Sequence, residues 1–133
     1  MHKIMALDIG TKRIGIALSD FLHMLSTGHS CIARMPENEA VNTISKIAQE
    51  NRVEEIVIGV PINMDGTKGF QADDCLEFSK KLKQFKIIYE DERLTSETAE
   101  ENLREQKIDF KKNKGLVDIE SARLILEQYL ARL

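Results

Sequence analysis

The stretch from Lys3 to Leu18, KIMALDIGTKRIGIAL, determines how the chain begins to fold. Lys3 to Ile9 is an apolar run that ends in an acid and then a glycine, which is the pattern of a buried strand. After a tight turn, Lys12 to Leu18 alternates as a second strand does. The stretch therefore predicts an antiparallel hairpin with Asp8 at the end of its first strand.

Further strands and helices follow along the chain. A third strand is predicted within Met24 to Ala33, and apolar residues at helical spacing then predict a helix up to about Asn51. The β-branched run from Glu55 to Val60, stopped by Pro61, is typical of a strand buried on both faces. The remaining pattern predicts a helix, a strand and two helices: Gln71 to Phe85, Lys86 to Asp91, Thr95 or Ser96 to about Gln106, and about Asp118 to Leu133.

This order predicts an α/β protein. Three strands in succession and then strand-helix alternation indicate a mixed sheet with helices on its faces, because each crossover helix returns the chain to a parallel neighbour. The order is that of the ribonuclease H-like fold. A length of 133 residues is typical of one domain, so we expect residues 1–133 to share a single core.

The composition excludes several classes of protein. With 19 Lys and Arg against 22 Asp and Glu, the net charge of −3 argues against a protein that coats nucleic acid through bulk charge. Cys31 and Cys75 lie far apart without a CxxC spacing, which indicates neither a disulfide framework nor a zinc site. No apolar run has the length of a membrane span, so we expect a cytoplasmic protein without a membrane partner.

Acids at strand ends are the first candidates for chemistry, because ligands of open α/β sheets gather beyond the strand ends. Asp8 interrupts an apolar strand, and a buried carboxylate without a partner is costly, so Asp8 must be partnered or metal-bound. Asp91 ends the last strand on the face of Ile87 and Tyr89, and Glu92 follows it on the other face.

Asp118 is the third candidate acid. It opens the final predicted helix, and its spacing to Ala122 and Ile125 turns it toward the sheet. Carboxylates from two strands and a packed helix could converge into the all-oxygen environment that Mg²⁺ or Mn²⁺ prefers. Two such ions about 4 Å apart activate water and stabilise a leaving oxygen, which suits phosphodiester hydrolysis.

Each acid also has a plainer interpretation. Asp8 is alternatively a hydrogen-bonded structural residue, Asp91 a strand-end charge or a partner of Arg93, and Asp118 a complement to the helix N-terminus. None of these alternatives is excluded by spacing alone.

Two motifs would suit phosphate recognition. Thr11, Lys12 and Arg13 place a hydroxyl and two cations beside Asp8, although a tight turn with exposed charges has the same pattern. A basic stretch precedes Gly115 and would lie at the mouth of a site containing Asp118: Arg104, Lys107, Lys111, Lys112 and Lys114. Such a run is also typical of a solvated face. If both motifs bind phosphate, nucleic-acid binding should be salt-sensitive and focused on one basic edge.

Four blocks of this sequence occur in the order of the signature blocks of a known family and span nearly the whole chain: LDIGTKRIGIALSD (Leu7 to Asp20), VIGVPINMDGT (Val57 to Thr67), DERLTS (Asp91 to Ser96) and KGLVDIESARLILEQYL (Lys114 to Leu130). The chain resembles the YqgF family, also called RuvX, of ribonuclease H-like proteins. The resemblance implies a five-stranded mixed sheet, with its first three strands antiparallel, flanked by about four helices.

The resemblance also implies a nuclease site at Asp8, the Asp91–Glu92 pair and Asp118, with Mg²⁺ or Mn²⁺ as cofactor. We assign Asp91 as the second acid and metal ligand because its parity matches that of Tyr89 and Ile87, with Glu92 as the alternative. Asn63, Arg93 and Thr95 would shape the site or the substrate path.

The activity that the resemblance implies is processing of the 5′ end of precursor 16S ribosomal RNA in ribosome biogenesis. An earlier assignment of the family, Holliday junction resolvase, makes branched DNA the alternative substrate. A resolvase should dimerise to make paired cuts, and the sequence is compatible with a monomer or a homodimer.

Two other classes compete with a nuclease. Actin-type and sugar kinases have a similar DIGT loop but clamp ATP between two such domains, and this length supplies one. A non-catalytic nucleic-acid-binding module is the second alternative. Aromatic residues make up only 5% of the chain, without Trp, so a surface built on base stacking is not expected.

Overall fold

The computed structural model describes residues 1–61, 69–91, 95–108 and 113–133, without the side chains of residues 95–97. The order of elements predicted from the sequence is confirmed: β1 (Lys3–Ile9), β2 (Arg13–Ser19), β3 (Ser26–Ala33), α1 (Glu37–Glu50), β4 (Val53–Val60), α2 (Phe70–Ser79), β5 (Lys86–Asp91), α3 (Thr95–Glu105) and α4 (Lys114–Leu130).

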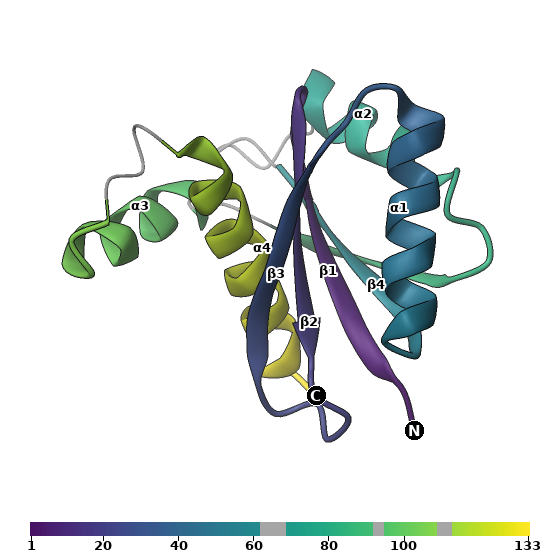
Figure 1. Ribbon diagram of the computed structural model, residues 1–133, viewed down its shortest axis with the longest axis horizontal. Helices are drawn as coiled ribbons and strands as arrows, with labels where there is room; N and C mark the ends of the chain where they lie inside the picture. Colours follow the sequence, from purple (N-terminus) through teal and green to yellow (C-terminus); the bar gives the residue numbers. More distant parts are fainter. Residues whose placement is uncertain (62–68, 92–94, 109–112) are drawn as a thin grey trace.

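The strands form one five-stranded sheet in the order β3-β2-β1-β4-β5. The β1–β2 and β2–β3 pairs are antiparallel, and the β1–β4 and β4–β5 pairs are parallel, so the predicted mixed sheet is confirmed. Helices α1 and α2 cover one face, and α4, with α3 beside it, covers the other (Figure 1). No helix within the described ranges is both long and apolar enough to cross a membrane.

Strand β1 contributes to a core on each side of the sheet. Leu7 and Ile9 belong to the apolar cluster that packs against α1 and α2. Ile4 and Ala6 belong to the cluster that packs against α4. Because successive side chains of a strand alternate between faces, Asp8 continues the row of Ile4 and Ala6. Asp8 therefore faces α4, at the end of the sheet where β1 turns into β2.

Two helix boundaries differ from the prediction. Helix α2 ends at Ser79 instead of Phe85, and two successive turns follow it. The apolar spacing continued past the helix because Leu82 is fully buried from within these turns. Helix α4 begins at Lys114, four residues before Asp118, although it has a glycine, which disfavours a helix, at its second position. The expectation that Asp118 opens this helix was wrong.

The glycine in the first turn of α4 has a packing reason. A Cβ atom placed on Gly115 would lie 3.4 Å from the Cβ atom of Cys31 in β3, so the helix start lies close against the sheet. The macrodipole acts on charges within the first turn, and Asp118 lies beyond it. The interpretation of Asp118 as a mere complement to the helix N-terminus loses its support.

Candidate active site

Asp8 and Asp118 lie close together because α4, which carries Asp118, crosses the sheet at the glycine that pairs with Asp8. Gly15 of β2 pairs with Asp8 across the β1–β2 hairpin. A Cβ atom on Gly15 would lie 2.0 Å from the backbone oxygen of Asp118 and 2.4 Å from its carbonyl carbon. Helix α4 therefore crosses directly over Gly15, and two acids from opposite ends of the sequence share one region of the sheet.

A second glycine accommodates the same turn of α4. A Cβ atom on Gly28 of β3 would lie 2.5 Å from the Cγ2 atom of Ile119. The roles of Gly15 and Gly28 were not predicted, although an isolated glycine inside a strand is itself a signal of close backbone approach.

The carboxylate of Asp118 points toward the sheet, as its helical spacing predicts. The Arg13 guanidinium donates a hydrogen bond from Nε to Oδ2 of Asp118 at 2.7 Å, and the side chains are 39% and 21% exposed, respectively. The hydrogen bond and charge of Asp118 raise the pKa of Arg13. Arg13, predicted to bind substrate, is thus paired with a candidate catalytic acid.

Cys31 completes the surroundings of Asp118. Its Sγ atom lies 3.8 Å from Oδ2 of Asp118, within the range of a weak S–H hydrogen bond. Burial, and next the negative charge of Asp118, raise the pKa of Cys31 to about 11, and the charge of Asp8 acts in the same direction. The thiol is therefore protonated at neutral pH and is not a ready nucleophile.

The donor set fits a hard divalent cation in part. Asp8 and Asp118 offer carboxylate oxygens, which Mg²⁺ and Mn²⁺ prefer. Among the side chains that the structure describes, no three His, Cys, Asp or Glu residues are grouped as a metal site would require. A third carboxylate predicted from the sequence, Glu92, lies outside the described residues.

The structure changes the argument for Asp91. Ile87 packs against the α1–α2 cluster, and the Tyr89 hydroxyl shares a hydrogen bond of 2.8 Å with α2. Glu90, on the opposite face, contacts α4. Alternation therefore places the Asp91 side chain on the α2 face, whereas Asp8 faces α4. Parity with Ile87 and Tyr89, which favoured Asp91 in the sequence, is in fact an argument against it.

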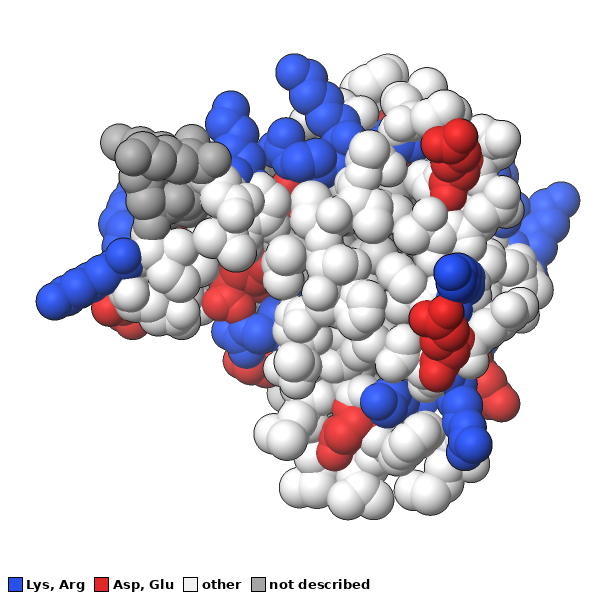
Figure 2. Space-filling view, viewed as in Figure 1, with Lys and Arg blue, Asp and Glu red and all other residues white. Residues whose placement is uncertain are grey.

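The remaining predicted residues divide into described and undescribed ones. Thr11 and Lys12 are exposed in the β1–β2 turn, and Lys114 is exposed at the start of α4. In Figure 2, Lys and Arg side chains gather along the upper edge, at the end of the sheet that carries this turn. The Thr95 side chain is not described, and four predicted substrate-binding residues lie outside the described ranges: Asn63, Arg93, Lys111 and Lys112.

A buried arginine, whose role was not predicted from the sequence, supports the β1–β2 turn. Arg34 is 6% exposed and donates a hydrogen bond to the carbonyl oxygen of Gly10 at 3.1 Å. Its guanidinium also donates to Asp74 of α2 at 2.8 Å and to Glu37 of α1 at 3.0 Å. Arg34 therefore ties both helices of one face to the turn that carries Thr11.

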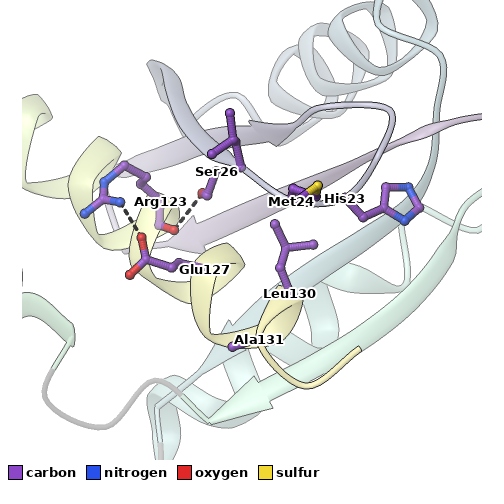
Figure 3. Close-up of a pocket in the computed structure, with 8 residues that line it drawn as sticks. His23, Met24, Ser26, Arg123, Glu127, Leu130 and Ala131 are labelled. Atoms are coloured by element: carbon purple, nitrogen blue, oxygen red, sulfur yellow. Dashed lines mark hydrogen bonds and ion pairs between the residues drawn. The ribbon is translucent and has the colours of Figure 1, made fainter.

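A groove of about 530 Å³ lies at the other end of the sheet (Figure 3). It is formed by the β2–β3 turn and the C-terminal half of α4, and its lining residues are His23, Met24, Leu25, Ser26, Arg123, Glu127, Leu130 and Ala131. The groove's carboxylate, Glu127, points to Arg123, which donates to it at 2.7 Å. The groove therefore lies away from Asp8, and its carboxylate is already paired with an arginine.

Comparison with known proteins identifies the family of this chain. The sequence matches the family RuvX, described as Holliday junction resolvase, over residues 2–132. A relative from Crocosphaera subtropica is 43% identical over 98% of this chain and 94% of its own length, and one from Syntrophomonas wolfei is 40% identical over 96% and 93%. Both relatives carry the provisional name pre-16S rRNA nuclease.

Solved structures share the fold at low sequence identity. The fowlpox virus resolvase in complex with Holliday junction DNA superposes with a TM-score of 0.61 at 12% identity, covering 98% of this chain and 97% of that one. Thermus thermophilus RuvC with a junction substrate gives 0.56 at 10% identity, covering 99% and 95%. The sheet order and these likenesses confirm the predicted ribonuclease H-like fold.

Proposed function

Because the chain belongs to the RuvX family and is a nuclease, we propose that Asp8 and Asp118 serve a divalent-metal-dependent cleavage of precursor 16S ribosomal RNA. The observation that carries the proposal is the crossing of α4 over Gly15, which brings these two carboxylates together beside exposed cations. The relatives' shared name supports the RNA substrate. We place the reaction in the cytoplasm, as a step of ribosome biogenesis.

Two groups of described residues would have different roles in this reaction. Asp8 and Asp118 would hold Mg²⁺ or Mn²⁺, which when bound supplies an activated water and stabilises the leaving oxygen. Thr11, Lys12 and Lys114 would bind backbone phosphates, since a hydroxyl and ammonium groups are suitable donors at an exposed rim. Burial and the charge of Asp118 raise the pKa of Cys31, which favours water over this thiol as the nucleophile of the proposed reaction.

For the third carboxylate we propose Glu92 in preference to Asp91. The support is the alternation of β5, which directs Asp91 away from the face that carries Asp8. We also propose that five residues whose side chains the structure does not describe contact the substrate: Asn63, Arg93, Thr95, Lys111 and Lys112.

Resolution of branched DNA is the second candidate function. It is supported by the description of the family and by the likeness to two resolvases solved with junction DNA. This function would require a homodimer, because paired cuts in a two-fold junction need two-fold symmetry.

A cleavage assay on two substrates distinguishes the two functions. The purified chain would be given a 5′-extended 16S RNA fragment and a four-way DNA junction, each with Mg²⁺, Mn²⁺ or EDTA. We expect metal-dependent cleavage of the RNA, none in EDTA, and no paired nicks in the junction. Paired nicking of the junction with intact RNA would favour the resolvase. Binding of RNA without cleavage in either metal would favour a non-catalytic module.

A further inference from the structure

Arg13 binds one oxygen of Asp118, the carboxylate that we propose as a metal ligand. Its Nε donates to Oδ2 of Asp118 at 2.7 Å, which occupies that oxygen with a charged donor. The Cys31 thiol lies 3.8 Å from the same oxygen, a longer and weaker contact than that of the guanidinium. In the structure, Arg13 is therefore the counter-ion of Asp118.

The side chain of Arg13 can move away from Asp118 while its backbone stays in place. Its backbone is fixed at the start of β2, where the Gly10 amide donates to the Arg13 carbonyl at 2.8 Å. Its side chain is more than a third exposed, and an ion pair at such a rim is weak because water and salt screen it. Movement away from Asp118 would therefore require no change in the sheet.

A divalent ion and Arg13 compete for Asp118. Both need the same carboxylate, and two cations bound to neighbouring oxygens repel each other. A displaced guanidinium would lie beside Lys12 on the rim, where a phosphate offers the two-oxygen geometry that arginine binds well.

We propose that Arg13 is an exchangeable counter-ion: it neutralises Asp118 while no metal ion is bound, and it transfers to a phosphate of the nucleic acid when a metal ion takes its place. This inference rests on the proposed metal-dependent function and deepens it. It makes the metal ion and the nucleic acid bind cooperatively, because each favours the same position of Arg13, and the coupling is reciprocal.

Mn²⁺ affinity of the metal-stripped full chain tests the exchange without relying on activity. Isothermal titration would compare the wild type with Arg13→Ala and with Arg13→Gln, which keeps a hydrogen-bond donor but removes the charge. We expect both variants to bind Mn²⁺ about fivefold more tightly than the wild type, and Lys12→Ala, which removes an equal charge from the same turn, to stay within about twofold. A short single-stranded RNA should tighten Mn²⁺ binding in the wild type, and this gain should be lost in both Arg13 variants.

Each outcome has one meaning. If the wild type binds Mn²⁺, Asp118→Asn weakens that binding, and the Arg13 variants bind no more tightly than the wild type, the exchange is overturned and the metal site stands. If the wild type does not bind Mn²⁺ at millimolar concentration, the metal-dependent function fails and the exchange fails with it. Thermal unfolding in EDTA identifies a misfolded variant, and the second Arg13 variant then decides.

Discussion

Replacement of Asp8 by Asn is expected to slow cleavage of the precursor RNA by a factor on the order of a hundred to a thousand. Asparagine has nearly the same shape and keeps hydrogen-bonding atoms, but it lacks the charge that holds a divalent cation. Asp118→Asn should have a loss of similar size, since Asp118 lies beside Asp8 across Gly15. The measurement is the single-turnover cleavage rate at fixed Mn²⁺, with the folded fraction checked by thermal unfolding.

Two further acids serve as controls for this loss. Asp20 lies at the other end of the sheet, where its side chain accepts hydrogen bonds from the amides of Met24 and Leu25 at 2.8 and 3.0 Å. Asp20→Asn keeps an accepting oxygen and should retain full activity. Asp91→Asn should retain most activity, because β5 directs Asp91 to the α2 face. Wild-type rates in both Asp8→Asn and Asp118→Asn would place the reaction elsewhere on the chain.

The second large effect is expected from Gly15→Ala, a change that adds one methyl group. This methyl would lie 2.0 Å from the backbone oxygen of Asp118, and a backbone atom cannot rotate out of the way. Helix α4 must therefore lift from the sheet and carry Asp118 away from Asp8. We expect about 1–3 kcal/mol of destabilisation from overpacking. A displacement of about 1 Å at the acid would reduce activity about a hundredfold in the variant that remains folded.

Gly28→Ala is the matched control for this prediction. Its methyl would meet the side chain of Ile119 at 2.5 Å, and that side chain can change its rotamer. Urea unfolding and single-turnover rates would be measured on both variants. We expect Gly28→Ala to lose stability with little loss of rate at full folding. Equal rates in folded Gly15→Ala and wild type would show that the close crossing of α4 does not position Asp118.

Local patterns in the sequence were sufficient to predict the sheet and the positions of two candidate acids, Asp8 and Asp118. Alternation and helical spacing depend on neighbouring residues, so they gave the order of elements and placed Asp8 at the end of a central strand. Asp118 was directed to the sheet by its spacing to Ala122, even though the helix start was wrong, because register along a helix does not depend on where it begins.

Three features that depend on contacts between distant residues were not predicted. Alternation along β5 showed that Asp91 shares a face with Tyr89 but not which face carries Asp8, because that depends on how β5 aligns with β1 through β4. In the sequence Arg34 looks the same as a surface arginine, and only the packing of both helices buries it. The pairing of Arg13 with Asp118 likewise follows from the crossing of α4.

The central claim is that Asp8 and Asp118 form the divalent-metal site, and the position of Mn²⁺ on the folded chain tests it most directly. Substoichiometric Mn²⁺ added to the ¹⁵N-labelled protein should first broaden the amide resonances of Asp8, Gly15 and Asp118. The amides of Met24 and Leu25, which lie at the other end of the sheet and donate to Asp20, should stay sharp. Broadening confined to that end, with the resonances of Asp8 and Asp118 unchanged, would contradict the claim.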